Sequence, residues 1–121
     1  ETNEAIMITA VDGTILRVNQ AFTNTTGYCA DEVVGKNPSI MKSGRHTIEF
    51  YQQMWESLNS EGHWQGEVWN RRKSGEIFPM WQQVTTVYDE DKTITHYVST
   101  FMDITDRKLA EERIHQITNL G

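Results

Sequence analysis

The sequence lacks several features that common classes of protein require. It has a single cysteine among 121 residues, which excludes an internal disulfide and any multi-cysteine metal site. Its net charge of −6 offers no electrostatic footprint for nucleic acid. No apolar run approaches the roughly 20 residues of a membrane span, and no charged-then-apolar start indicates a signal peptide. We therefore expect one cytoplasmic domain without direct membrane insertion, cut as a module from a longer protein.

Patterns that carry catalysis or hold metals are also missing. The sequence contains no glycine-rich phosphate loop, and no His-x-x-x-His or Glu-x-x-His pair falls on a helix expected in the domain body. Glu111 and Glu112 are carboxylates on a strongly charged segment near the end of the chain. We expect no enzyme activity and no metal site in this module.

The first half of the chain combines a hairpin with helices. Two apolar runs, at residues 5–9 and 14–18, flank an Asp-Gly pair, which favours a tight β-hairpin. Short helical pieces interrupted by glycine and proline follow between residues 19 and 44. Over residues 47–62 the apolar positions recur at three- and four-residue spacing, which predicts one amphipathic helix.

The second half of the chain has the pattern of long strands. Residues 64–72, 76–88 and 93–103 are rich in β-prone side chains and are separated by Lys-Ser-Gly and Asp-Glu-Asp turns. Together with the first hairpin they predict an α+β fold: a five-stranded antiparallel sheet with short helices on one face and a C-terminal exit helix.

The last segment reads as a charged helix with a narrow apolar strip. Thr105 is a plausible N-cap, and Ala110, Ile114 and Ile117 repeat at four- and then three-residue spacing. One interpretation is that the helix packs back on its own sheet. Because the strip is so narrow, we favour pairing with a partner helix, as in a coiled coil.

Five stretches, taken in order, resemble a PAS domain across nearly the whole chain: DGTILRVNQAF, TGY, EVVGKN, GHWQGEVWNRRKSGEIFP and YVSTFMDITDRK. The resemblance is closest to PAS modules that precede diguanylate cyclase, cyclic-di-GMP phosphodiesterase or histidine kinase domains. GKNPSIMKSG and NRRK are also similar to the FAD-binding, redox-sensing PAS domain of nitrogen-fixation regulators. The resemblance implies a PAS fold and a sensor rather than a catalyst.

The resemblance also implies a division of labour along the chain. Residues 1–105 form the sensor domain of a bacterial signal-transduction protein, and residues 106–121 form a signalling helix. The sensor detects a ligand or a redox state and relays it through Asp103, Ile104 and Thr105 to an effector domain in the same chain. Flanking helices would make the protein a homodimer. The alternative is a cofactor-free PAS module that serves only dimerisation and relay.

A pocket on the concave face of the sheet is the expected sensor site. Strand alternation directs Val68 and Asn70 to one face and Trp69 to the other. In flavin-binding PAS domains an asparagine at the position of Asn70 bonds the pyrimidine edge of the ring. Alternatively, Asn70 satisfies backbone groups or waters in a plain core. The predicted cofactor contacts are Asn37, Trp55, Trp64, Asn70, Met80, Gln82, Ser99 and Phe101. The wider wall also includes Ile8, Phe22, Val34, Ile40, Met41, Tyr51, Val68 and Phe78.

The resemblance to PAS domains suggests three candidate cofactors: FAD, heme and FMN. FAD, held noncovalently, is the leading candidate. Heme is less favoured, because the long helix has no histidine for an axial ligand; His46 and His63 lie just outside it and are expected to be solvated. In light-sensing LOV domains the photoactive cysteine aligns with Pro38, and three further FMN-related positions align with Ser39, Met80 and Phe101. On this comparison FMN held as in LOV domains is excluded.

The hairpin around Gly75 is expected to expose two tryptophans. A three-residue loop centred on Gly75 would place Asn70 opposite Met80 and Trp69 opposite Trp81, whereas a two-residue loop would shift the register by one. The two indoles would form an outward interface for an N-terminal helix or a second PAS domain. The alternative is a cross-strand pair that stabilises a lone sheet.

Overall fold

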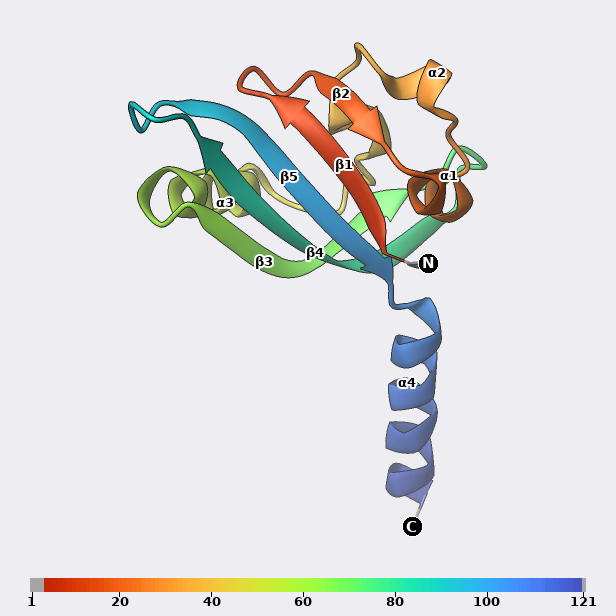
Figure 1. Cartoon of the computed structure of the whole chain (residues 1–121). Coiled ribbons are helices and arrows are strands. Elements are labelled where there is room, and N and C mark those ends of the chain that lie inside the picture. The colour runs from red at the N-terminus through yellow and green to blue at the C-terminus, as the bar shows by residue number, and fades with distance from the viewer. Residues whose placement is uncertain (1–3, 121) are drawn as a thin grey trace.

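The computed structural model describes residues 4–120 and contains one five-stranded antiparallel sheet (Figure 1). In chain order the elements are β1 (Ala5–Ala10), β2 (Ile15–Val18), α1 (Gln20–Thr26), α2 (Ala30–Val33), the 3-10 turn η1 (Pro38–Met41), α3 (Ile48–Ser60), β3 (His63–Arg71), β4 (Ile77–Tyr88), β5 (Ile94–Asp103) and α4 (Thr105–Leu120). The strands lie side by side in the order β2-β1-β5-β4-β3. This arrangement confirms the predicted α+β class.

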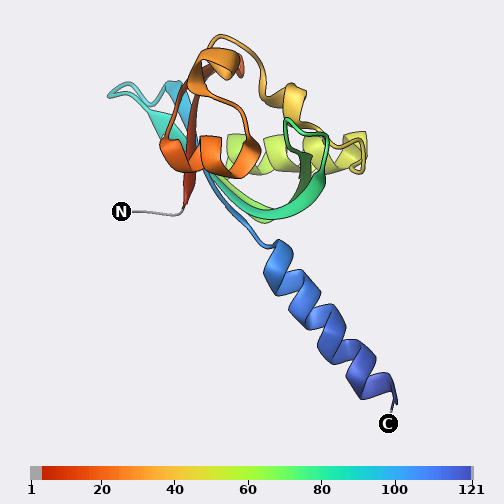
Figure 2. The same ribbon diagram turned by 90° about the vertical axis from the view of Figure 1, so that its right-hand side faces the viewer.

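The helices α1, α2 and α3 and the turn η1 gather on one side of the sheet, and α4 stands apart from them (Figure 2). After β5 the chain turns directly into α4, which projects away from the domain body. The sheet thus has an inner face under the helices and an outer face without a helical layer. Its last strand leads straight to the exit helix.

Asn19 fixes the start of α1 against the first strand. Its side-chain oxygen accepts hydrogen bonds from the backbone N–H groups of Phe22 and Ile6, both at 2.9 Å. The first of these bonds is an N-cap, which satisfies an N–H group that has no partner inside the helix. The second bond ties the same cap to β1. One side chain therefore starts the helix and docks it on the sheet, which directs Phe22 into the core.

The main core lies between the inner face of the sheet and the helices. Phe22 is completely buried and meets the ring of Phe101 edge-on, with ring centroids 5.7 Å apart. Residues from β1, β3, β4 and β5 that share the inner face complete the cluster, among them Met7, Val68 and Met80. A second, smaller cluster around Leu58 anchors α3 on the sheet.

The register of the β3–β4 hairpin differs from the predicted one by two residues. Asn70 pairs with Phe78 and Trp69 pairs with Pro79. The reason is that the three-residue loop is centred on Ser74, while Gly75 occupies its last, left-handed position at φ 98°. A shift of two residues preserves the faces, so Asn70 still points inward. The two tryptophans, however, do not pair directly across the strands.

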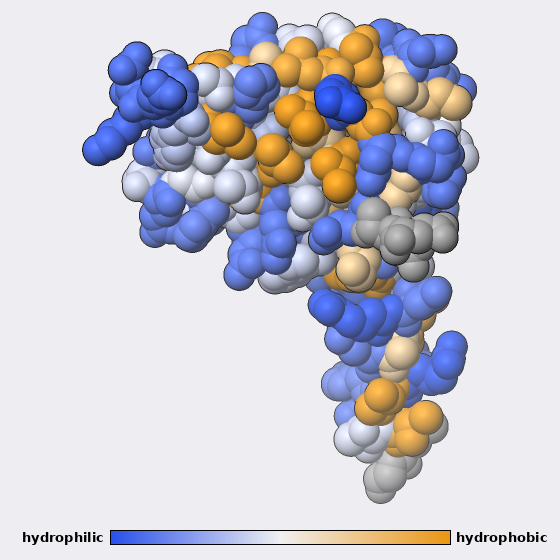
Figure 3. Space-filling model, in the orientation of Figure 1, coloured by the Kyte–Doolittle hydropathy of each residue, from blue (hydrophilic) through white to orange (hydrophobic). Residues whose placement is uncertain are grey.

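The outer face of the sheet carries apolar side chains, which gather over β1 and β5 in Figure 3. Ile8 belongs to this face: it pairs with Val98, and the buried neighbours on its strand are Met7 and Thr9. The prediction that Ile8 lines the pocket was therefore wrong. Met102, half exposed, lies on the same outer face opposite Trp81. An apolar surface of this kind is typical of an interaction site.

Replacing Phe22 with alanine tests the packing of α1 on the sheet. Because the ring is fully buried, we expect the free energy of unfolding to fall by about 3–5 kcal/mol, measured by urea denaturation. Ile48→Ala is the matched control, since that side chain is 72% exposed and should change stability by less than about 0.5 kcal/mol. Equal effects of the two substitutions would contradict this assignment of the core.

Candidate ligand cavity and exit-helix junction

A cavity of about 280 Å³ lies between the inner face of the sheet and the segment from η1 to α3. Its floor consists of buried side chains of β1, β3, β4 and β5, such as Met7, Val68 and Ser99. Its mouth is formed by exposed residues of the β1–β2 turn and of the segment around η1, including Asp12, Asn37 and Lys42. The cavity is thus a pocket with a largely apolar floor that holds a few polar groups, and with a polar rim.

Seven of the eight predicted cofactor contacts line this cavity. They are Asn37, Trp55, Asn70, Met80, Gln82, Ser99 and Phe101. The eighth, Trp64, does not line it: its ring lies against the backbone of Gly66 and packs edge-on to Phe50. A side chain on Gly66 would collide with that ring at 2.9 Å, so glycine makes room for the indole there. Of the wider predicted wall, Met41, Tyr51 and Val68 line the cavity, whereas Phe22, Val34, Ile40 and Phe78 do not.

Several lining residues were missed by the sequence analysis. Met7 and Thr9 line the floor from β1, and Tyr97 and Val84 line it from β5 and β4. Period-two alternation within these strands was the signal that would have found them. The residues of the rim, such as Lys42, lie in irregular backbone, where no periodicity predicts direction.

Polar groups at the floor of the cavity are only weakly engaged within the protein. The Asn70 amide donates to the thioether sulfur of Met80 at 3.6 Å, and sulfur is a weak acceptor. The Gln82 amide donates to the Ser99 hydroxyl at 3.4 Å, close to the upper limit for a hydrogen bond. These donors and the amide oxygens beside them can therefore exchange their present partners for those of a bound molecule.

The rim of the cavity continues into residues 42–46, which we call the edge strap because they run along the outer strand β3. Lys42 forms a backbone bridge with Asn70. The Ser43 hydroxyl donates to the Trp69 carbonyl at 2.7 Å, and the Trp69 N–H donates to Nε2 of His46 at 2.8 Å. The strap thus occupies the backbone groups of a strand edge that would otherwise stay open.

His46 has a structural role in this strap and is not a solvated residue as predicted. Its ring stacks on Phe50, with centroids 4.0 Å apart, and its Nε2 accepts the Trp69 N–H. Burial and then the nearby Arg45 charge lower the pKa of His46, against an opposing effect of Glu67. The neutral ring that can accept this hydrogen bond is therefore the favoured form.

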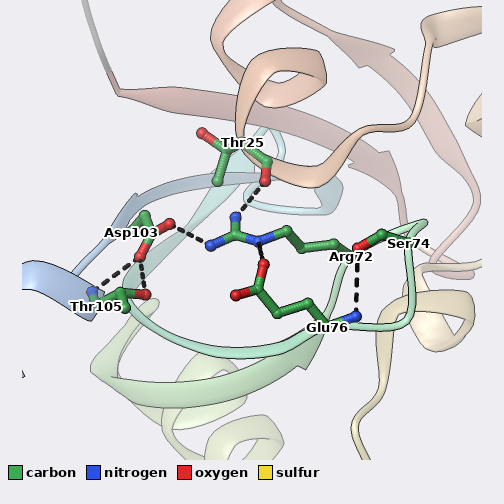
Figure 4. A network of polar contacts seen from close by, with 6 residues as sticks. All are labelled: Thr25, Arg72, Ser74, Glu76, Asp103 and Thr105. Atoms are coloured by element: carbon green, nitrogen blue, oxygen red, sulfur yellow. Dashed lines mark hydrogen bonds and ion pairs between the residues drawn. The ribbon is translucent and has the colours of Figure 1, made fainter.

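The junction of β5 and α4 is held by Arg72, which links three separate segments (Figure 4). Its guanidinium donates to the Thr25 carbonyl at the end of α1 at 2.5 Å, to Glu76 at 2.7 Å and to Asp103 at 2.6 Å. The same group lies 3.8 Å from the centre of the Phe78 ring. The planar guanidinium can satisfy several acceptors at once, which suits it to such a crossing point.

Asp103 connects this crossing point to the exit helix. Its Oδ1 accepts from the backbone N–H and the hydroxyl of Thr105, at 2.9 and 2.5 Å, while Oδ2 receives Arg72. Thr105 is accordingly the first residue of α4 and not its N-cap as predicted; the capping carboxylate precedes it by two residues. Ile104 between them is buried.

The charge of Asp103 is favoured by these partners. Burial raises its pKa, but the hydrogen bonds from Thr105 and Arg72 together outweigh burial, so the pKa lies below the ordinary 3.8. The junction therefore contains an ionised carboxylate at neutral pH.

The predicted interface residues are largely accessible. In α4, Ala110 is exposed, and Ile114 and Ile117 are each 64% exposed. Trp69 and Trp81 are half buried on the outer face of the sheet, and the Arg45 guanidinium lies 3.9 Å from the centre of the Trp69 ring. The structure thus leaves the strip on α4 without a cover among residues 4–120.

The described part of the chain has neither a cluster of metal ligands nor a helix suited to a membrane. No group of three or more His, Cys, Asp or Glu side chains within residues 4–120 is arranged to hold a metal ion. None of the helices in that range combines the length and the apolar character that a membrane crossing demands.

Comparison with characterised proteins shows relatives among regulators and kinases. The chain is 33% identical to the bacterioopsin transcriptional activator of Halobacterium salinarum over 83% of its own length and 15% of that protein. It is 28% identical to the nitrogen fixation regulatory protein of Klebsiella oxytoca, over 94% of this chain and 23% of that protein. It is 30% identical to blue-light-activated histidine kinase 1 of Erythrobacter litoralis, over 90% of this chain and 33% of that protein. The chain thus spans a minor part of each relative.

Solved structures share the fold closely. The PAS domain of a Colwellia psychrerythraea protein superposes with a TM-score of 0.82 at 21% identity, covering 87% of this chain and 89% of that one. An RNA-binding light-oxygen-voltage receptor gives a TM-score of 0.82 at 23% identity, covering 99% of this chain and 34% of that one. The LOV domain of an Erythrobacter litoralis blue-light-activated histidine kinase gives 0.77 at 19% identity, covering 87% and 99%.

These comparisons overturn the exclusion of FMN held as in LOV domains. LOV domains share this fold, and blue-light-activated histidine kinases are among the sequence relatives, so the exclusion was wrong. Its physical error is clear: the proline at position 38 removes the thiol needed for a covalent adduct, but noncovalent binding depends on the cavity as a whole. Without the exclusion of FMN, there is no longer a reason to prefer FAD over FMN.

A family profile matches most of the chain. The profile of the PAS domain covers residues 3–106, which is the sheet with its helices and the first residues of α4. The fold, the inner cavity and the strand-to-helix junction all lie within this span. The chain belongs to the PAS domain family.

Proposed function

We propose that this PAS domain is the sensory module of a multidomain signalling protein and that it binds a small, flat, uncharged ring system in its cavity. The observation that carries the proposal is the floor of the cavity, where the loosely engaged amides of Asn70 and Gln82 face an otherwise apolar space. Ligand pockets typically combine apolar walls with a few such polar groups. A ring edge that alternates carbonyl and N–H groups matches amide side chains, which offer both a donor and an acceptor.

The isoalloxazine ring of FMN is the ligand we select for the test, because LOV domains and blue-light-activated kinases are among the similar proteins. Asn70, Gln82 and Ser99 fit the polar edge of such a ring, and Lys42 at the rim provides a cation for a phosphate. A bound flavin would supply light absorption and redox chemistry. The chain's one cysteine, Cys29, is exposed and does not line the cavity, so this chain's contribution is noncovalent.

The proposed output path begins on the strands that form the floor. Asn70 lies two residues before Arg72, and Arg72 bonds Asp103, which in turn bonds the first residue of α4. A ligand that prefers one arrangement of β3 thereby favours one arrangement of the junction through Asp103, Ile104 and Thr105. Residues 1–105 act as the sensor and residues 106–121 as the signalling helix; residues 1–3 and 121 lie outside the described part.

The rest of the protein enters the proposal through its relatives. An effector domain in the same chain receives the signal, and a histidine kinase is supported by the names of several relatives. A cyclic-di-GMP enzyme remains a prediction from the sequence resemblance. The strip on α4 pairs with that of a second copy, and the apolar outer face of the sheet with Trp69 and Trp81 adds to the interface. We place the module in the cytoplasm.

Titration of the purified chain with FMN, followed by flavin fluorescence, tests the ligand. Asn70→Ala and Gln82→Ala should each weaken binding about three- to tenfold, because each removes one hydrogen bond to the ring. Gln83→Ala is the matched control, since Gln83 neighbours Gln82 on β4 but faces outward toward Gln65. Binding that ignores all three substitutions would place the ligand elsewhere. Absence of FMN binding would favour the cofactor-free relay module.

The charge of Asp103 should stabilise the fold in a pH-dependent way. Since the pKa of Asp103 is lowered from 3.8 by the folded surroundings, its contribution is complete above pH 3.8 and is lost as the pH falls through the lower folded-state value. Asp103→Asn should cost about 0.5–1 kcal/mol at pH 7, and the difference from wild type should shrink only as the pH falls below 3.8. Urea unfolding between pH 7 and 3 measures this. Asp106→Asn is the control for the loss of one charge, since Asp106 lies on the exposed first turn of α4 while Arg72 and Thr105 bond Asp103 instead.

Self-association should depend on the strip of α4. Ile114→Asp should weaken dimer formation at least about tenfold, because a dimer would bury an unpaired carboxylate there. Gln116→Asp adds the same charge on another face of the helix and should leave association unchanged. Sedimentation equilibrium over a wide range of protein concentrations provides the measurement. A dimer that tolerates Ile114→Asp would point to the sheet face instead.

A further inference from the structure

The strand β3 carries different connections on its two faces. Val68 and Asn70 face the cavity, whereas Glu67 and Trp69 face outward. The Trp69 indole N–H donates to Glu67 Oε2 at 3.2 Å. These two outward side chains of β3 are therefore bonded to each other directly behind the floor of the cavity.

The edge strap reaches this outward pair from one side. Arg45 lies over the Trp69 ring at 3.9 Å, a distance typical of a cation–π contact. The backbone of Trp69 is bonded on both sides by the strap, through Ser43 and His46. Displacement of the strap would therefore remove contacts to both the ring and the backbone of Trp69.

The exit helix reaches the same pair from the other side. Lys108, in the first turn of α4, donates to both carboxylate oxygens of Glu67, at 2.9 and 3.1 Å. The two side chains are about one-third exposed, so the ion pair is partly shielded from solvent. The Lys108 ammonium also lies 6.0 Å from the centre of the Trp69 ring, at the outer limit for a cation–π contact.

We infer that the edge strap at the rim of the cavity and the exit helix are coupled across the outer face of β3 through Arg45, Trp69, Glu67 and Lys108. The path is separate from the junction at Arg72 and Asp103, which lies at the hairpin end of the sheet. It gives the rim of the cavity its own connection to α4. A contact chain becomes a coupling only if a change at one end alters the other, and mutational cycles measure this.

The test is a double-mutant cycle on the 121-residue chain without ligand. Arg45→Ala perturbs the strap, and hydrogen exchange at the Lys108 amide, which donates to the Ile104 carbonyl, reports on the first turn of α4. In the wild-type background we expect exchange there to accelerate about two- to fivefold, the size set by a partly exposed ion pair. In the Lys108→Gln background, Arg45→Ala should have no further effect at that amide.

Arg107 provides the matched control. It precedes Lys108 on α4 but forms its ion pair with Glu111 of the same helix. In an Arg107→Gln background the effect of Arg45→Ala should be as large as in wild type. A second measurement uses salt: at about 1 M the ion pair is screened, and the effect of Arg45→Ala on the helix should shrink as it does in Lys108→Gln.

Either of two results would overturn the inference. One is that Arg45→Ala leaves hydrogen exchange in the first turn of α4 unchanged, although the Trp69 indole signal in the NMR spectrum shifts. The other is an equal effect of Arg45→Ala with and without the Lys108 charge. Both substituted side chains lie at the surface, and the same spectra report whether each variant is folded. Because no ligand is added, failure here leaves the FMN proposal standing, and failure of FMN binding leaves the coupling standing.

Discussion

The ion pair between Arg72 and Asp103 is the interaction on which the arrangement of this domain around its exit helix depends. It joins the β3–β4 hairpin to the end of β5, and the same guanidinium holds the end of α1. Its value is geometric more than energetic. Partly exposed ion pairs contribute little to stability, but a guanidinium that rests on the Phe78 ring and has three acceptors in fixed directions leaves the carboxylate few alternatives. Because that carboxylate also bonds the first residue of α4, the helix begins at a defined point.

The second constraint is the alternation of side chains along β3. One strand places an amide in the cavity and, one residue away, an indole that lies against the strap and bonds Glu67, the partner of the exit helix. A ligand bonded to Asn70, as proposed, would act on a backbone whose neighbouring residue, Trp69, is bonded to Ser43 and His46. The cavity and the outer surface are therefore separated by a single layer of backbone. Successive side chains of a strand point to opposite faces of the sheet, so the residue that faces the cavity is the direct neighbour of one that faces the outer surface. A signal between the two faces therefore needs no long path through the core.

The sequence was sufficient to predict the fold, but not to predict where side chains point in irregular backbone. The Asp-Gly hairpin, the spacing of apolar residues over residues 47–62 and the three β-rich runs predicted the elements, because each depends on local periodicity. The hairpin register failed because it depends on whether Ser74 or Gly75 is the centre of the loop, and both choices satisfy the sequence. The strap was missed since its bonds join residues about 25 positions apart, for which one sequence gives no signal. Trp64 and Ile8 were misplaced because an aromatic or aliphatic side chain does not reveal whether it packs in a core, faces a cavity or lies outside.

Two anchors explain how a small domain can direct a helix that extends away from it. A single contact at Asp103 fixes where α4 begins but leaves its direction free to swing about that point. The bond from Lys108 to Glu67, three residues after Thr105 and about one helical turn along, adds a second point and so fixes a direction. Loss of either anchor would leave the fold intact, because the core around Phe22 and Phe101 does not include them. The orientation of the apolar strip on α4 can therefore change at a small cost in free energy while the domain itself stays folded, which is the property that a signalling helix requires.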